Sequence, residues 1–154
     1  MALASHFGPW LLGTVKNTTG TTAGTIRNMG ATEVAQFAAL GFADGATQVA
    51  VLPAGALVTA LDIITTTGFA GGTSPTITLS SGSTTITSAL TSPSTAGKTA
   101  FTVATTGAAF CANVGSTDAI VTATLAGGST SGAATVVIRY VVRNSDGSAN
   151  PSQV

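Results

Sequence analysis

The sequence predicts an all-β protein, and three observations support this. Much of the chain consists of short runs in which Thr or Ser alternates with Val, Ile or Leu, which is the period-two pattern of half-buried strands. Gly, Pro and Ser clusters with turn chemistry separate these runs. Only 6% of the residues are charged, so the exposed side of the strands carries hydroxyl groups rather than ions.

The N-terminal residues 1–24 are expected to form an arm and a loop. Gly8 and Pro9 prevent the segment from forming a regular helix or a central strand. The arm either folds back onto its own domain or lies across a neighbouring subunit. In the second case its contact residues are Phe7, Pro9, Trp10, Leu11 and Leu12. No secretory leader is expected, because no Lys or Arg precedes the apolar part.

Residues 25–144 are expected to form the β domain, and its first half contains one ambiguous segment. Residues 33–40 combine good helix formers with strand-forming neighbours, so helix and strand both remain open. Residues 56–65 predict a long strand after the turn Pro53-Ala54-Gly55. Strict alternation places Leu57 and Thr59 on one face and Val58 and Asp62 on the other. Both faces are apolar apart from Asp62, which is typical of a strand covered on both sides.

The second half of the domain predicts further strands and turns. Residues 76–80 and 84–87 flank a short Gly-containing turn and predict a hairpin. Residues 98–104 predict a strand with Phe101 and Val103 facing inward. Two more strands are expected over residues 118–125 and 133–143, and the second places Arg139 and Arg143 on one outer face. Residues 145–154 are expected to form a flexible tail.

Together these segments give about eight to nine strands at intervals of about 8–12 residues, which is typical of a β-sandwich or barrel. The expected fold is therefore a single-domain, jelly-roll-like β-sandwich or barrel with an extended N-terminal arm. Strand order does not follow from periodicity.

The sequence does not predict an enzyme. The only His, His6, lies in the irregular arm, where no nucleophile pattern surrounds it. The five acidic residues are scattered one per segment: Glu33, Asp44, Asp62, Asp118 and Asp146. No metal, phosphate or dinucleotide motif is present, so no cofactor is expected. The single Cys111 is interpreted as a small buried apolar residue. Zero net charge disfavours binding to nucleic acid or to an anionic membrane.

The composition instead favours assembly with other proteins. A hydroxyl-rich surface can be covered without stripping strongly hydrated ions. The rare charges are then candidates for fixing register across interfaces. Arginines are the strongest of these because guanidinium groups are enriched at interfaces, and Asp62 is the carboxylate in the interior of a predicted strand. The candidates are Arg27, Asp62, Arg139 and Arg143.

Residues 48–58, the segment Pro75–Leu79 and the closing run 134–140 together resemble the capsid decoration, or cement, proteins of tailed bacteriophages. The resemblance implies a jelly-roll-like homotrimer, made in the host cytoplasm, on the outer surface of the virion head. There it clamps adjacent subunits of the major capsid protein. One alternative is a tail or head-fibre module that recognises a host surface glycan. Another is a small hydrolase or lyase on the same scaffold.

Overall fold

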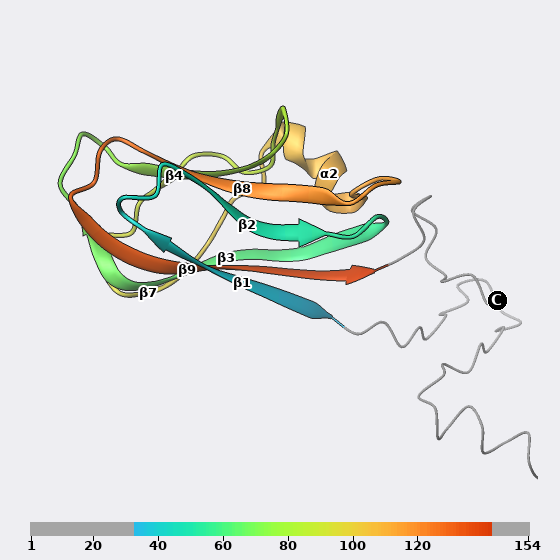
Figure 1. Cartoon of the computed structure of the whole chain (residues 1–154), viewed down its shortest axis with the longest axis horizontal. Helices are drawn as coiled ribbons and strands as arrows, with labels where there is room; N and C mark the ends of the chain where they lie inside the picture. The colour runs from blue at the N-terminus through green and yellow to red at the C-terminus, as the bar shows by residue number, and fades with distance from the viewer. Residues whose placement is uncertain (1–32, 143–154) are drawn as a thin grey trace, which may run out of the picture. The chain divides into compact units, whose positions relative to one another are not determined.

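The computed structural model describes residues 33–142, which form two stacked antiparallel β-sheets (Figure 1). The predicted all-β sandwich is confirmed. The strands are β1 (Val34–Gly41), β2 (Ala46–Leu52), β3 (Ala56–Ala70), β4 (Thr76–Ser81), β5 (Thr84–Thr85), β6 (Leu90–Thr91), β7 (Gly97–Ala100), β8 (Ala119–Ala126) and β9 (Ser131–Val142). A 3₁₀ turn, η1 (Thr105–Gly107), leads into the short helix α2 (Ala108–Ala112). Residues 33–142 contain no helix with the length and apolarity needed to cross a bilayer.

The strand order alternates between the two sheets. One sheet, called the A sheet here, has the order β1-β9-β3-β7. The other, the B sheet, has the order β2-β8-β4-β5, and β6 also pairs with β4. Consecutive strands from β1 to β4 belong alternately to the A sheet and the B sheet, and the same is true of β7, β8 and β9. Segments far apart in the sequence therefore become neighbours, as β1 and β3 do on either side of β9.

The ambiguous segment at residues 33–40 is a strand. β1 pairs with β9 in an unbroken antiparallel register from Val34 opposite Tyr140 to Gly41 opposite Ala133. Tertiary pairing with β9 overrides the helix propensity of its Ala, Gln and Leu residues. The predicted hairpin is also confirmed, because Ser80 pairs with Thr85 across a turn in which Gly82 has a φ of +53°.

The core lies between the sheets and consists of aliphatic side chains from both. Each such side chain contributes about 1.5–3 kcal/mol by leaving water. The largest fully buried apolar residues are Leu40, Leu52, Ile63, Ile77, Leu79, Ile86, Val121, Val136 and Ile138. The first strand of this hairpin has one apolar and one hydroxyl face, since Ile77 and Leu79 are buried and the alternating Thr76 and Thr78 are partly exposed.

A β-bulge in β3 corrects the predicted faces at the start of this strand. Val58 pairs with Tyr140 and Ala60 with Arg139, so Thr59 is the extra residue between two successive pairs. The extra residue reverses the alternation before it. Val58 therefore packs against the core, whereas strict alternation predicts it on the face of Asp62.

β7 is shorter than predicted. It ends at Ala100, and the chain then turns away toward η1. Phe101 is buried as expected, but Val103 is 42% exposed and the prediction that it faces inward is wrong. Beyond Ala100, Val103 makes only an isolated bridge to Thr87. Because Val103 lies outside a regular strand, the period-two alternation of a paired strand does not determine which way its side chain points.

A side chain joins the two sheets where β1 and β2 lie side by side. Gln36 of β1 accepts a hydrogen bond from the Val51 N–H of β2 at 3.0 Å. Its amide nitrogen donates to the Val51 carbonyl at 2.6 Å and to the Tyr140 hydroxyl at 3.0 Å. One amide thus acts as a strand partner for the edge of the B sheet and fixes the two sheet edges together.

Candidate interaction surface

The two outer faces of the sandwich differ in chemistry. The strands of the B sheet contain no charged residue, and the outer face of this sheet is lined mainly by hydroxyl groups, with the exposed pair Val51 and Ile120 at its β2 side. Its central members are Thr76, Thr78, Ser80, Thr122 and Thr124. This face meets the expectation of a threonine-coated surface, and its hydroxyl groups are readily hydrated.

The outer face of the A sheet is apolar with a line of ions across it. Its residues alternate with the buried core residues Leu61, Ile63, Val136 and Ile138. They are Ala35, Phe37, Ala39, Ala60, Asp62, Ile64, Lys98, Ala100, Thr135, Val137 and Arg139. Phe37 is 66% exposed and Ile64 is 40% exposed, although both lie within regular strands. Exposed apolar residues of this size on one sheet face are typical of an interaction surface.

The ions form a continuous network, called the ionic row here. The Lys98 Nζ lies 3.0 Å from an Asp62 carboxylate oxygen, and the Arg139 Nη2 lies 3.3 Å from the same oxygen. The Arg139 Nη1 lies 3.6 Å from the Glu33 carboxylate. The Thr59 hydroxyl also donates a hydrogen bond to Glu33.

The sheet register brings these four residues together. Lys98 on β7 is opposite Ile64 of β3, two residues along the strand from Asp62, which makes the Lys98–Asp62 pair diagonal. Arg139 on β9 is opposite Ala60 of β3 on one side and Ala35 of β1 on the other. Side chains on adjacent strands at direct or diagonal positions are within reach of one another. The ionic row therefore crosses the whole A sheet, from the start of β1 to β7.

The signs along the ionic row alternate, and its net charge is zero. Within residues 33–142, Lys98 and Arg139 are the two basic residues, and both belong to it. The Asp62 side chain is only 7% exposed, whereas those of Arg139 and Lys98 are 39% and 58% exposed. A buried carboxylate without partners would be strongly unfavourable. Here its charge is already matched, so another protein could cover the face without leaving a charge uncompensated.

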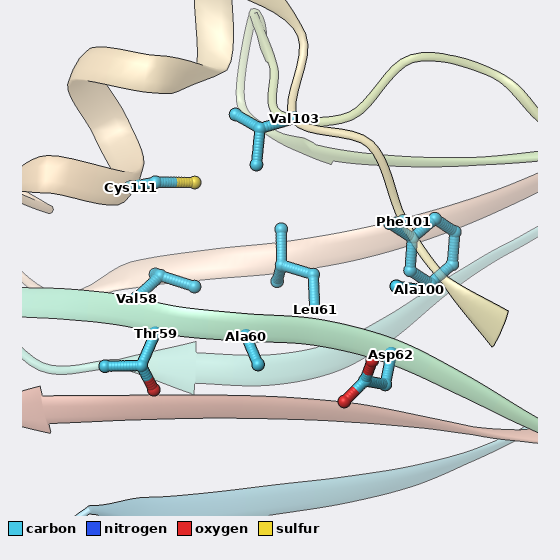
Figure 2. A pocket seen from close by; sticks show the side chains of 9 residues that line it. All are labelled: Val58, Thr59, Ala60, Leu61, Asp62, Ala100, Phe101, Val103 and Cys111. Atoms are coloured by element: carbon cyan, nitrogen blue, oxygen red, sulfur yellow. The ribbon is translucent and has the colours of Figure 1, made fainter. Parts of the chain in front are cut away.

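A groove of about 270 Å³ runs along the edge of β3 beyond the end of β7, and Thr59, Ala60 and Asp62 of the A sheet also line it (Figure 2). Its lining is mostly apolar and includes Leu61, Phe101, Val103 and the thiol of Cys111. Burial raises the pKa of the Cys111 thiol, which keeps it protonated and poorly nucleophilic at neutral pH. Figure 2 shows Cys111 and the Asp62 carboxylate on opposite sides of β3. The groove therefore does not pair a nucleophile with a base.

The described residues contain no cluster of three or more His, Cys, Asp or Glu side chains that could hold a metal ion. Asp118 directly precedes β8. It accepts a hydrogen bond from the Ala54 N–H at 3.0 Å, so the carboxylate fastens the turn between β2 and β3.

The structure brings two of the predicted interface residues together, because Asp62 and Arg139 form an ion pair. The other candidates lie outside the described residues: Phe7, Pro9, Trp10, Leu11, Leu12, Arg27 and Arg143. Sequence reasoning missed Glu33, Lys98 and Phe37. The scarcity of charge was an available signal, since a lone Lys and Glu in an almost ion-free domain are expected to find partners.

Comparisons with known proteins give a fold but not a family. No protein-family model matches the sequence, and no curated protein matches it. One similar solved chain comes from the acidic stable capsid structure of Helicobacter pylori bacteriophage KHP30. It is 12% identical, with a TM-score of 0.53 over 71% of this chain and 87% of that chain. A chain of the cyanophage Pam1 capsid asymmetric unit is 19% identical, with a TM-score of 0.44 over 83% of this chain and 98% of that one. The chain thus shares its fold with a chain of a bacteriophage capsid structure.

Proposed function

We propose that this chain is a structural protein of a bacteriophage virion and that it decorates the outer surface of the head. In this role a homotrimer clamps adjacent subunits of the major capsid protein and performs no catalysis. The observation that carries the proposal is the fold shared with the KHP30 capsid chain, which extends over 87% of that chain. The alternation of strands between the two sheets also supports a jelly roll, the architecture implied by the resemblance to decoration proteins.

The outer face of the A sheet is the surface proposed to meet the capsid. It combines exposed Phe37 and Ile64 with ions that are already paired. Covering apolar area on this face is favourable by about 25 cal/mol per Å². The paired charges lower the penalty of excluding water and give the contact a fixed register. The hydroxyl face of the B sheet is then free to face solvent.

Clamping follows from several modest contacts made at once. When one subunit of a trimer is bound, the others are held at a high effective concentration near their sites. The trimer therefore dissociates from the capsid more slowly than a single subunit would. A protein that binds only the assembled lattice stabilises that lattice by mass action. The arm residues Phe7 to Leu12, together with Arg27 and Arg143, stay proposed contacts. Removal of residues 1–13 is expected to weaken binding to heads while the β domain stays folded.

Two isoleucines on opposite outer faces provide a matched test. Ile64 lies on the outer face of the A sheet and is 40% exposed, while Ile120 lies on the B sheet and is 53% exposed. Each would be changed to Gln in the full chain, and binding to heads assembled without this protein would be measured by co-sedimentation. Ile64→Gln is expected to weaken binding at least tenfold, and Ile120→Gln to leave it unchanged. Equal effects would refute the assignment of the A face, and absence of any binding to heads would refute the proposed function.

A further inference from the structure

Within residues 33–142 the two sheets have four edges, and three of them are protected against pairing with another strand. β7 is only four residues long and carries Lys98, and β5 has only two residues. Short strands and lysines are devices that prevent edge-to-edge association. β2 has a bulge between Gln48 and Ala50, and both backbone groups of Val51 are bound by Gln36.

The free edge of β1 has none of these devices along most of its length. Its eight residues include no charge and no proline, and its register with β9 is unbroken. Only its last residue is blocked, because the Gly41 N–H donates to the Asp44 carboxylate at 2.7 Å. An uncharged, regular edge of this kind is a template for another strand.

The alternation of the β1–β9 ladder identifies the available backbone groups. The Phe42 N–H donates to the Gly132 carbonyl at 3.0 Å, whereas the Gly41 N–H points away to Asp44. Backbone groups in an antiparallel pair alternate between the partner and the opposite edge. Those of Ala35, Phe37 and Ala39 therefore project from the free edge, and none of the described residues pairs with them there.

We infer that this edge pairs antiparallel with β1 of a second copy, about a two-fold axis at Phe37. The residues whose backbone groups project outward are small, large and small, so the edge is symmetric about Phe37. In this register Phe37 lies opposite its counterpart, and Ala35 lies opposite Ala39 of the other copy. Each pair can exchange two backbone hydrogen bonds. The paired residues 35–39 of both copies are uncharged, so no like charges lie opposite each other between them.

The pairing also covers the most exposed large apolar side chain of the described residues, since Phe37 is 66% exposed. The two aromatic rings become cross-strand neighbours on the outer face of the A sheet, and such pairs stabilise antiparallel strands. The contact needs no capsid, so it goes beyond the proposed function. A two-fold contact cannot close a three-fold ring, so in a homotrimeric protein it would join one trimer to the next.

Disulfide trapping in the full chain tests the contact and its register. In a Cys111→Ser background, Phe37→Cys is expected to give a covalent dimer on mild oxidation. Hydrogen-bonded pairs place Cα atoms about 5.5 Å apart, within the range of a disulfide. Phe42→Cys is the control, because Phe42 is exposed but lies beyond the end of β1. Ala35→Cys alone is expected to give little dimer, and an equal mixture with Ala39→Cys is expected to give abundant dimer.

The inference is overturned if Phe37→Cys gives no more dimer than Phe42→Cys, or if Ala35→Cys alone cross-links as well as the mixture. Trapping of Phe37→Cys on a capsid protein without dimer formation would also overturn it, because the edge would then accept a foreign strand. Failure of head binding with normal dimer trapping would instead refute only the proposed function.

A second measurement follows self-association without a new thiol. Phe37→Lys is expected to raise the dissociation constant for self-association at least tenfold in sedimentation velocity, and Phe42→Lys to leave it unchanged. Thermal unfolding of both variants checks that the domain remains folded. Equal association of the two variants would contradict the inference.

Discussion

The guanidinium of Arg139 lies 3.3 Å from the carboxylate of Asp62, although 77 residues separate them in the sequence. Arg139 is on β9 opposite Ala60, and Asp62 is on β3 opposite Val137, so the pair is diagonal across the ladder. Lys98 from β7 reaches the same carboxylate from the other side. The Asp62 carboxylate therefore links three strands of the A sheet, because it lies on β3 and pairs with basic side chains on β7 and β9.

Asp62→Asn is expected to lower the free energy of unfolding by about 1–2 kcal/mol. Breaking a fully buried ion pair costs about 3–5 kcal/mol, but Arg139 and Lys98 are partly exposed and water screens part of the loss. Urea denaturation would measure the change. A double-mutant cycle with Lys98→Ala isolates the pair, and a coupling energy of zero would show that the two side chains do not interact in solution.

Gln36→Ala is expected to lower the free energy of unfolding by about 1 kcal/mol. It removes two exposed hydrogen bonds to Val51, which water can replace in part, and one part-buried hydrogen bond to Tyr140. The loss should be local as well as global, because both backbone groups of Val51 lose their partner. Hydrogen exchange of the Val51 amide should become faster. The control is Gln48→Ala, which removes an exposed glutamine from β2 and should change neither quantity. Unchanged exchange at Val51 would rule out the bridging role.

Gly132→Ala is expected to destabilise the domain by roughly 2–4 kcal/mol, from backbone strain and overpacking. Gly132 has a φ of +136°, and an added Cβ would collide with the ring of Phe69 in the core. Gly45→Ala is the matched control, because a Cβ at that position meets no atom within 4 Å. Thermal unfolding compares the two. A melting temperature for Gly132→Ala equal to that of the control would contradict the packing described here.

The Cys111 thiol predicts a loss of stability at alkaline pH. Its pKa is raised by burial, so the folded state holds the proton to higher pH than the unfolded chain does. The stability from this group is fully present below the unfolded pKa of about 8.5 and is lost as pH rises through the folded pKa. Above about pH 8.5, the unfolding free energy of the wild type should fall more steeply with pH than that of Cys111→Ala. Parallel pH profiles would show that the thiol titrates normally.

Local sequence patterns predicted the strands well because alternation of Thr with Val, Ile or Leu is a property of neighbouring residues. They predicted the closing strand with Arg139 on its outer face and the hairpin after Thr76. They failed where one extra residue changed the phase, as at the Thr59 bulge, and where a ladder ended early, as before Val103. Neither event leaves a mark in the period-two pattern itself.

The ionic row shows why the site was only half predicted. Asp62 and Arg139 stood out individually as charges within strands. Their pairing, and the recruitment of Glu33 and Lys98, depend on the order β1-β9-β3-β7. That order is set by contacts between distant segments, and periodicity carries no information about it. The hydrogen bonds by which Gln36 protects the edge of β2 could not be predicted for the same reason.

Cryo-electron microscopy of phage particles isolated from the source of this chain tests the proposed function most directly. The proposed function predicts copies on the outer surface of the head. Phe37, Ile64 and the ionic row are then covered by neighbouring protein, and the hydroxyl face of the B sheet is toward solvent. Heads that lack the chain, or copies whose A face is open to solvent, would contradict it.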